Sequence, residues 1–136
     1  MKDIKLDINT KQYDGKKIID NIDLSVNGNI YIKNKETYII YKEENEGSKC
    51  TTMIKIYENK ITVKKMGSIT SLMVFEEGKK TPCKYITPQG VFHIEIDTEE
   101  LSIVGEDENI SNISIKYDID IMNIFNGRNE MTIKIS

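Results

Sequence analysis

MGSITSLMVFEEGKKTPCKYITPQGVFHIEIDT, residues 66–98, is the stretch of this sequence that decides the fold. It contains three runs of strand-forming residues, two turn signals and both prolines of the chain. In the last run Phe92, Ile94 and Ile96 occupy every second position, which is the period of a β-strand with one face in water. The turn before this run comes at Pro88-Gln89-Gly90, because proline lacks the N–H that a central strand position requires. The stretch therefore predicts a β-meander in the middle of a barrel or a sandwich.

The alternation continues on both sides of this stretch. Near the N-terminus it places Ile4, Leu6 and Ile8 on one strand face, with polar residues between them. In the last third it predicts a long strand with five apolar residues on one face: Ile113, Ile115, Tyr117, Ile119 and Ile121. Tight turns are expected at three glycine-containing pairs: Asp14-Gly15, Asn27-Gly28 and Asn126-Gly127. The polar segment Glu43–Lys49 is expected to be the longest loop.

About ten such strands occur at near-regular spacing, and no segment has a helical period. This pattern favours an all-β fold, a single antiparallel up-and-down β-barrel, over a sandwich with crossed connections. Closing the sheet would also remove the exposed edges of an isoleucine-rich ribbon. A chain of 136 residues is long enough to bury one core, so residues 1–136 are predicted to form one barrel domain.

The composition limits the class of protein. Charged residues make up 30% and hydrophobic residues 38% of the chain, so we expect it to fold. A net charge of −3 offers no positive footprint for a phosphate backbone, so no nucleic-acid partner is expected. Without an export signal or an apolar run of membrane-span length, the protein is expected to be cytoplasmic, with no membrane partner. In that reducing compartment Cys50 and Cys83 are expected to be unpaired.

Three segments of the sequence are similar to a known family. They are Ser71–Gly78 (SLMVFEEG), Tyr85–Gly90 (YITPQG) and Ile96–Thr98 (IDT). In these segments the chain resembles the YwiB-like family of uncharacterised bacterial proteins, and the strand around Tyr117 and the apolar C-terminal strand fit the same family. The resemblance implies a calycin-like β-barrel, similar in architecture to the lipocalins. It implies no activity and no catalytic residues.

Three side chains on one strand have a spacing that metal ligands can use. His93, Glu95 and Asp97 stand at positions i, i+2 and i+4 and could together face a cation. They also form the polar face opposite the apolar residues of the same strand. A lone histidine without a second nitrogen or sulfur ligand favours that simpler interpretation. We therefore predict no metal site and no cofactor.

No stretch carries a catalytic signature. Cys83 and His93 could act as thiolate and base, but nothing in the sequence brings them together. Paired carboxylates could supply the acid and base of a glycosidase, but these lie in turns or on polar strand faces: Glu76-Glu77, Glu99-Glu100 and Asp118 with Asp120. We therefore predict no catalytic residues and place an enzyme behind the non-enzymatic functions.

The interior of the predicted barrel offers the best candidate site. A tyrosine that faces the lumen brings an apolar ring and one hydrogen-bonding group, which together can orient a small ligand. The candidate ligand-binding residues are Tyr38, Tyr41, Met73, Phe75, Tyr85 and Tyr117. From them we predict a non-enzymatic cytoplasmic barrel that binds a small, largely apolar molecule. The alternative is a filled barrel that acts through its outer surface, as a homodimer or as an accessory to another protein.

Overall fold

The computed structural model describes residues 1–45, 47–121 and 124–136, and these form ten β-strands and one turn of 3-10 helix. The elements are β1 (Lys2–Asp14), β2 (Lys17–Lys33), β3 (Glu36–Asn45), β4 (Ser48–Tyr57), β5 (Lys60–Gly67), β6 (Thr70–Glu76), β7 (Lys80–Thr87), β8 (Gly90–Val104), η1 (Asp107–Asn109), β9 (Asn112–Ile121) and β10 (Phe125–Ile135).

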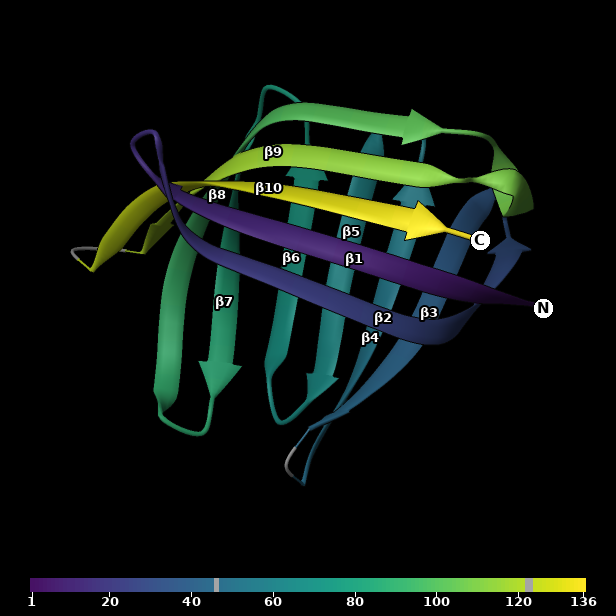
Figure 1. The fold of residues 1–136 in the computed structure, drawn as a ribbon, viewed down its shortest axis with the longest axis horizontal. Helices are drawn as coiled ribbons and strands as arrows, with labels where there is room; N and C mark the ends of the chain where they lie inside the picture. The colour runs from purple at the N-terminus through teal and green to yellow at the C-terminus, as the bar shows by residue number, and fades with distance from the viewer. Residues whose placement is uncertain (46, 122–123) are drawn as a thin grey trace.

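The strands form a closed barrel in which consecutive strands pair antiparallel and β1 closes the ring by pairing with β10. This arrangement confirms the predicted all-β, up-and-down barrel. Figure 1 shows two sets of strands that cross: β1, β2, β9 and β10 run across the front, and β3 to β7 run behind them. β8 bends from the second set into the first, and its register with β9 shifts between Thr98 and Glu100. That bulge bends the strand and lets one ribbon serve both sets.

Isoleucines on the inner strand faces form most of the core. Ile133 of β10 lies opposite both Ile8 of β1 and Ile113 of β9, and all three are buried. Antiparallel partners share a sheet face, so the alternation in each strand produces one continuous apolar surface inside the ring. Burying each such side chain stabilises the fold by about 1.5–3 kcal/mol. On β8 the predicted faces are confirmed, because Ile96 is fully buried and Glu95 is exposed.

The predicted turn at Asn27-Gly28 is wrong, because both residues lie inside the single 17-residue strand β2. Residues 17–30 of this strand pair with β1, and residues 28–33 pair with β3. A Cβ atom on Gly28 would lie 2.6 Å from the carbonyl oxygen of Ile40 in β3. Gly28 is therefore the point of close approach at which β2 passes from one partner strand to the next.

Two other local predictions are corrected, and two are confirmed. Asn126-Gly127 lies within β10 instead of forming a turn. The expected loop over Glu43–Lys49 is mostly strand, since β3 continues to Asn45 and β4 begins at Ser48; residue 46 lies outside the described residues. Cross-strand hydrogen bonding thus extends through polar residues that carry no apolar alternation. The turns at Asp14-Gly15 and Pro88-Gln89-Gly90 are confirmed, because strands end and begin on either side of them.

The two ends of the barrel differ. At one end, called here the η1 end, lie both termini, η1 and the connection from β8 to β9. Ile110, which follows η1, is buried in the core there. The opposite end carries the connections β1–β2, β3–β4, β5–β6 and β7–β8. None of the described residues belongs to a helix long and apolar enough to cross a membrane.

Candidate functional site

A cavity of about 500 Å³ lies inside the barrel. Its wall contains residues from every strand except β7 and β8. The apolar residues of the wall are Ile8, Ile22, Leu24, Ile54, Val63, Met73, Phe75, Met131 and Ile133. Small-molecule sites typically have volumes of about 300–1,000 Å³ and mostly apolar walls with a few polar groups, so the cavity has the size and character of such a site.

Five polar side chains form a row across β3 to β7. The strand registers pair Tyr41 with Thr52, Thr52 with Lys65, Lys65 with Ser71 and Ser71 with Tyr85. Because directly opposite residues share a face of the sheet, all five lie on the inner face of the barrel. We call these five residues the Lys65 row, and Tyr41 and Lys65 line the cavity directly.

Two hydroxyls of the Lys65 row are buried without a hydrogen-bond partner among the described residues. They are Thr52 Oγ1, in a fully buried side chain, and Ser71 Oγ, in a side chain that is 4% exposed. Burial raises the pKa of Tyr41 to about 12; the nearby Thr52 hydroxyl opposes part of this rise, although the two groups fall short of full hydrogen-bond geometry. Leaving a buried polar group unpaired costs about 1–3 kcal/mol. The row therefore places two unpaired hydroxyls directly beside Lys65, next to the residues that line the cavity.

A second polar row crosses β8, β9, β10 and β1. It pairs Thr98 with Tyr117, Tyr117 with Asn129 and Asn129 with Gln12. Thr98 Oγ1 and Asn129 Nδ2 are buried and also lack a partner within the described part of the chain. Burial raises the pKa of Tyr117 to about 12, so its hydroxyl stays a neutral donor at physiological pH. The inner surface is thus apolar along its isoleucines and polar along two rows.

The cavity reaches solvent where β2 and β3 separate. Residues 17–27 of β2 pair with β1 alone, and no ladder joins them to β3 among the described residues. Ile22 of β2 and Glu43 of β3 both line the cavity beside this gap, and Ile22 is 55% exposed. In Figure 1 this half of β2 runs across the front, away from the hairpin of β3 and β4. A ligand could enter the lumen there without any strand pair being broken.

Four of the six predicted ligand-binding residues line this cavity: Tyr41, Met73, Phe75 and Tyr117. Tyr85 lies on the inner face in the Lys65 row but outside the cavity wall. Tyr38 must be removed from the set, because it points outwards between the buried residues Thr37 and Ile39. Its ring stacks on Tyr31, with centroids 5.0 Å apart, and its hydroxyl donates to Glu36. Large apolar residues occupy both faces of this strand, so its sequence pattern does not show which face is the inner one.

Lys65 lines the cavity although it is not among the residues predicted from the sequence. It is half-buried, whereas the preceding Lys64 is exposed. The sequence does indicate an inward-facing lysine here, because adjacent strand residues point to opposite faces and one lysine of the pair Lys64-Lys65 must therefore face inwards. Ile61 and Val63, which are buried, share the parity of Lys65 and identify it as the inward member.

The possible enzyme centre is not assembled. Cys83 is buried and paired with Ile94 on the inner face of β7 and β8, whereas His93 is exposed on the outer face. Both residues line one surface groove over these strands. Burial raises the pKa of the Cys83 thiol, which disfavours the reactive thiolate. Across residues 1–45, 47–121 and 124–136, His, Cys, Asp and Glu side chains form no group of three that could hold a metal ion.

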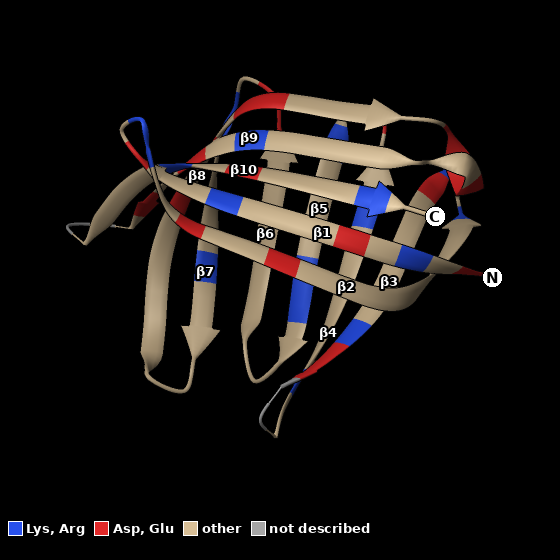
Figure 2. Cartoon of the chain, viewed as in Figure 1, with Lys and Arg blue, Asp and Glu red and all other residues tan. Residues whose placement is uncertain are grey.

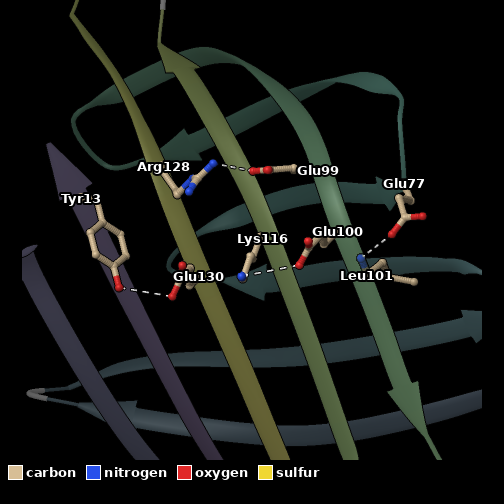
Figure 3. A network of polar contacts seen from close by, with 8 residues as sticks. All are labelled: Tyr13, Glu77, Glu99, Glu100, Leu101, Lys116, Arg128 and Glu130. Atoms are coloured by element: carbon tan, nitrogen blue, oxygen red, sulfur yellow. Dashed lines mark hydrogen bonds and ion pairs between the residues drawn. The ribbon is translucent and has the colours of Figure 1, made fainter. Parts of the chain in front are cut away.

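The paired carboxylates interact with groups on the outer surface. Arg128 Nη2 lies 2.6 Å from Glu99 Oε2, and Lys116 Nζ lies 3.5 Å from Glu100 Oε2 (Figure 3). Glu77 accepts a hydrogen bond from the backbone N–H of Leu101. Basic and acidic residues are interspersed along the front strands in Figure 2. Such exposed ion pairs contribute at most about 1 kcal/mol each and lack the apolar pocket that a catalytic acid requires.

Comparisons with known proteins give one family and one fold. Residues 4–133 match the family described as “Domain of unknown function (DUF1934)”. The chain is 31% identical over 101 residues to the “Uncharacterized beta-barrel protein YwiB” of Bacillus subtilis (strain 168), covering 74% of this chain and 70% of that protein. It also superposes on the crystal structure of the ywiB protein from Bacillus subtilis with a TM-score of 0.86 and 25% identity, covering 98% of this chain and 90% of the other.

Proposed function

The chain belongs to the family described as a domain of unknown function, DUF1934, and we propose that it is a non-enzymatic protein that binds a small, largely apolar molecule in the barrel lumen. The cavity of about 500 Å³ carries this proposal. An aliphatic or aromatic body inside it would be stabilised by about 0.8 kcal/mol per CH₂ group removed from water.

The buried polar groups support a ligand with one polar part. Thr52, Ser71, Thr98 and Asn129 each hold a buried polar atom without a partner in the described residues. These four residues do not line the cavity themselves, but each stands directly opposite Lys65 or Tyr117, which do. Leaving their polar atoms unpaired is costly, and a polar group bound at this edge of the cavity is the partner that we propose for them. Tyr41 and Tyr117 do line the cavity, and their neutral hydroxyls add two donors.

We also propose that the protein works in the cytoplasm. Both cysteines are free, with Cys50 half-buried and Cys83 buried. Free thiols are usual in a reducing compartment, where disulfides are rare.

Dye binding tests the proposed function. N-phenyl-1-naphthylamine is a neutral, apolar dye whose fluorescence increases when it leaves water, and the wild-type protein should bind it saturably at one site. Met73 lines the cavity, whereas its neighbour Leu72 points outwards and is 49% exposed. Met73→Trp should fill part of the cavity and weaken dye binding at least tenfold. Leu72→Trp adds the same side chain on the other face and should bind the dye as wild type does.

Equal binding by the two variants, or no saturable binding by the wild type, would contradict the proposal. Thermal unfolding of both variants shows whether either tryptophan disrupts the fold. Native mass spectrometry of protein purified from its own host would then report the mass of the natural ligand and the number of subunits together.

A feature of β2 favours a second candidate function, association with another copy of the chain. Ile18, Ile19 and Ile22 are 46–55% exposed on the part of β2 that pairs only with β1. An unpaired strand edge with exposed apolar side chains can pair with another chain. Light scattering should then show a dimer for the wild type and a monomer for Ile19→Lys. Monomeric wild-type protein would dismiss this candidate and leave the ligand-binding proposal unaffected.

A further inference from the structure

We propose that the Lys65 row binds the carboxylate of an aliphatic molecule whose hydrocarbon part occupies the cavity; this inference rests on the proposed binding function. Lys65 supplies the positive charge. It is the cationic side chain in the cavity wall, and no ion pair holds its ammonium group within the described residues. Lys65 is half-buried, and a charge that water screens less attracts an anion more strongly than a fully exposed charge does.

The groups beside Lys65 have the chemistry that a carboxylate needs. Thr52 and Ser71 stand directly opposite Lys65 on its two neighbouring strands, and their hydroxyls are buried without partners in the described chain. A carboxylate accepts hydrogen bonds and donates none. The ammonium group of Lys65 and the two hydroxyls can all donate, so these groups match a carboxylate. Hydrogen bonds to an ionised group are roughly twice as strong as neutral ones, so this head group is favoured over a neutral alcohol.

The wall below the Lys65 row suits a hydrocarbon chain. Two residues further along the same strands, about 7 Å towards the η1 end, stand Ile54, Val63 and Met73. All three line the cavity, and Ile54 and Val63 are buried. A molecule held by its head group at Lys65 would therefore extend its chain along Ile54, Val63 and Met73.

Glu43 restricts where in the cavity a carboxylate head group is favourable. It lines the same cavity two residues beyond Tyr41, towards the opposite end of the barrel, and is half-buried. Its negative charge disfavours a carboxylate at the rim and leaves the position beside Lys65 as the favourable one. An amine head group at the Lys65 row would meet an ammonium group instead of an anion.

Two ligands that differ only in the head group test this inference. Decanoate and 1-decanol are titrated against the dye-loaded protein, and displacement of N-phenyl-1-naphthylamine reports binding of each. The wild type should bind decanoate at least tenfold more tightly than decanol. Lys65→Met should remove this preference by weakening decanoate binding at least tenfold more than decanol binding, and Lys65→Arg should retain most of it. Lys64→Met removes the same charge from the outer face and should behave as wild type.

The outcomes separate this inference from the function on which it rests. Equal affinity of the wild type for decanoate and decanol, or the same loss in Lys65→Met and Lys64→Met, would overturn the carboxylate site while decanol binding still supported the lumen site. Tighter binding of decylamine than of decanoate would also overturn it. If neither ligand displaces the dye and the dye itself does not bind, the proposed function fails and the inference fails with it. Thermal unfolding shows whether Lys65→Met is folded, independently of ligand binding.

Discussion

The ring of Phe75 in β6 meets the ring of Tyr117 in β9 edge-on, with centroids 4.8 Å apart and ring planes at 63°. In the sheet these two strands are separated by β7 and β8. The contact therefore crosses the interior and joins two walls of the barrel directly, instead of following the hydrogen-bonded ladder. It also forms part of the cavity wall, so the same two rings contribute to stability and to the shape of the site.

A double-mutant cycle should detect this contact. Edge-to-face aromatic pairs contribute about 0.5–1.5 kcal/mol beyond the area they bury, so Phe75→Leu and Tyr117→Leu should couple by that amount in urea unfolding. Tyr57 is 44% exposed and provides the control. Phe75→Leu and Tyr57→Leu should be additive within about 0.5 kcal/mol. Additivity in the first cycle would mean that the two rings do not interact.

Neighbouring residues of β8 should differ sharply in their effect on stability. Ile96 is fully buried, so Ile96→Ala should lower the free energy of unfolding by about 2–5 kcal/mol. Glu95 is exposed, and its nearest cationic atom, Lys80 Nζ, is 4.0 Å away, so Glu95→Ala should change stability by less than about 0.5 kcal/mol. Ile94, on the inner face but only half-buried, should give an intermediate loss. Comparable losses at positions 95 and 96 would show that the faces are assigned wrongly.

Gly28→Ala should destabilise the barrel by about 1–3 kcal/mol. Its new methyl group would lie 2.6 Å from the Ile40 carbonyl oxygen and 3.1 Å from Leu6 Cδ1, so β2 and β3 would have to separate. Asn27→Ala, one residue earlier on the exposed face, should be nearly neutral. Chemical denaturation measures both changes. A neutral Gly28→Ala would mean that the corner of β2 tolerates a side chain.

Stability should fall in alkaline solution because of buried tyrosine. The pKa of Tyr117 is about 12 in the folded protein, compared with about 10 in the unfolded chain. Above pH 10 the unfolded chain loses this proton first, so the contribution is complete below pH 10 and is lost between about pH 10 and 12. The loss amounts to about 2–3 kcal/mol. Relative to Tyr117→Phe, the wild type should therefore lose this amount between pH 9 and pH 12 in urea unfolding. A constant difference between the two proteins would contradict the buried position of Tyr117.

The sequence predicted the faces of the strands well because alternation is local. Ile96 and Glu95 fall on the expected sides, and Pro88-Gln89-Gly90 forms the expected turn. The turns predicted from glycine pairs were less reliable, because glycine is suited both to a tight turn and to a point where two strands approach closely. Gly28 is needed for the second reason, and its role depends on Ile40, which lies in a different strand.

The candidate site was predicted only in part. Tyr41, Met73, Phe75 and Tyr117 were expected in the lumen and line the cavity. Tyr38 was expected there as well, but its strand has large apolar residues on both faces, and only the buried neighbours identify the inner one. Ile61, Val63 and Lys65 occupy every second position of one strand, so the same alternation predicts that Lys65 faces inwards.

The alternation of apolar and polar residues is enough to predict that the chain forms strands and which side of most strands is buried, because a period of two is encoded within each strand. Which polar residues meet inside the barrel depends on how the strands pair. Thr52, Lys65 and Ser71 stand side by side because the registers of β4 with β5 and of β5 with β6 align them. Thr98, Tyr117 and Asn129 do so because the registers of β8 with β9 and of β9 with β10 align them. Register is a relation between strands, and no local pattern in one strand can specify it.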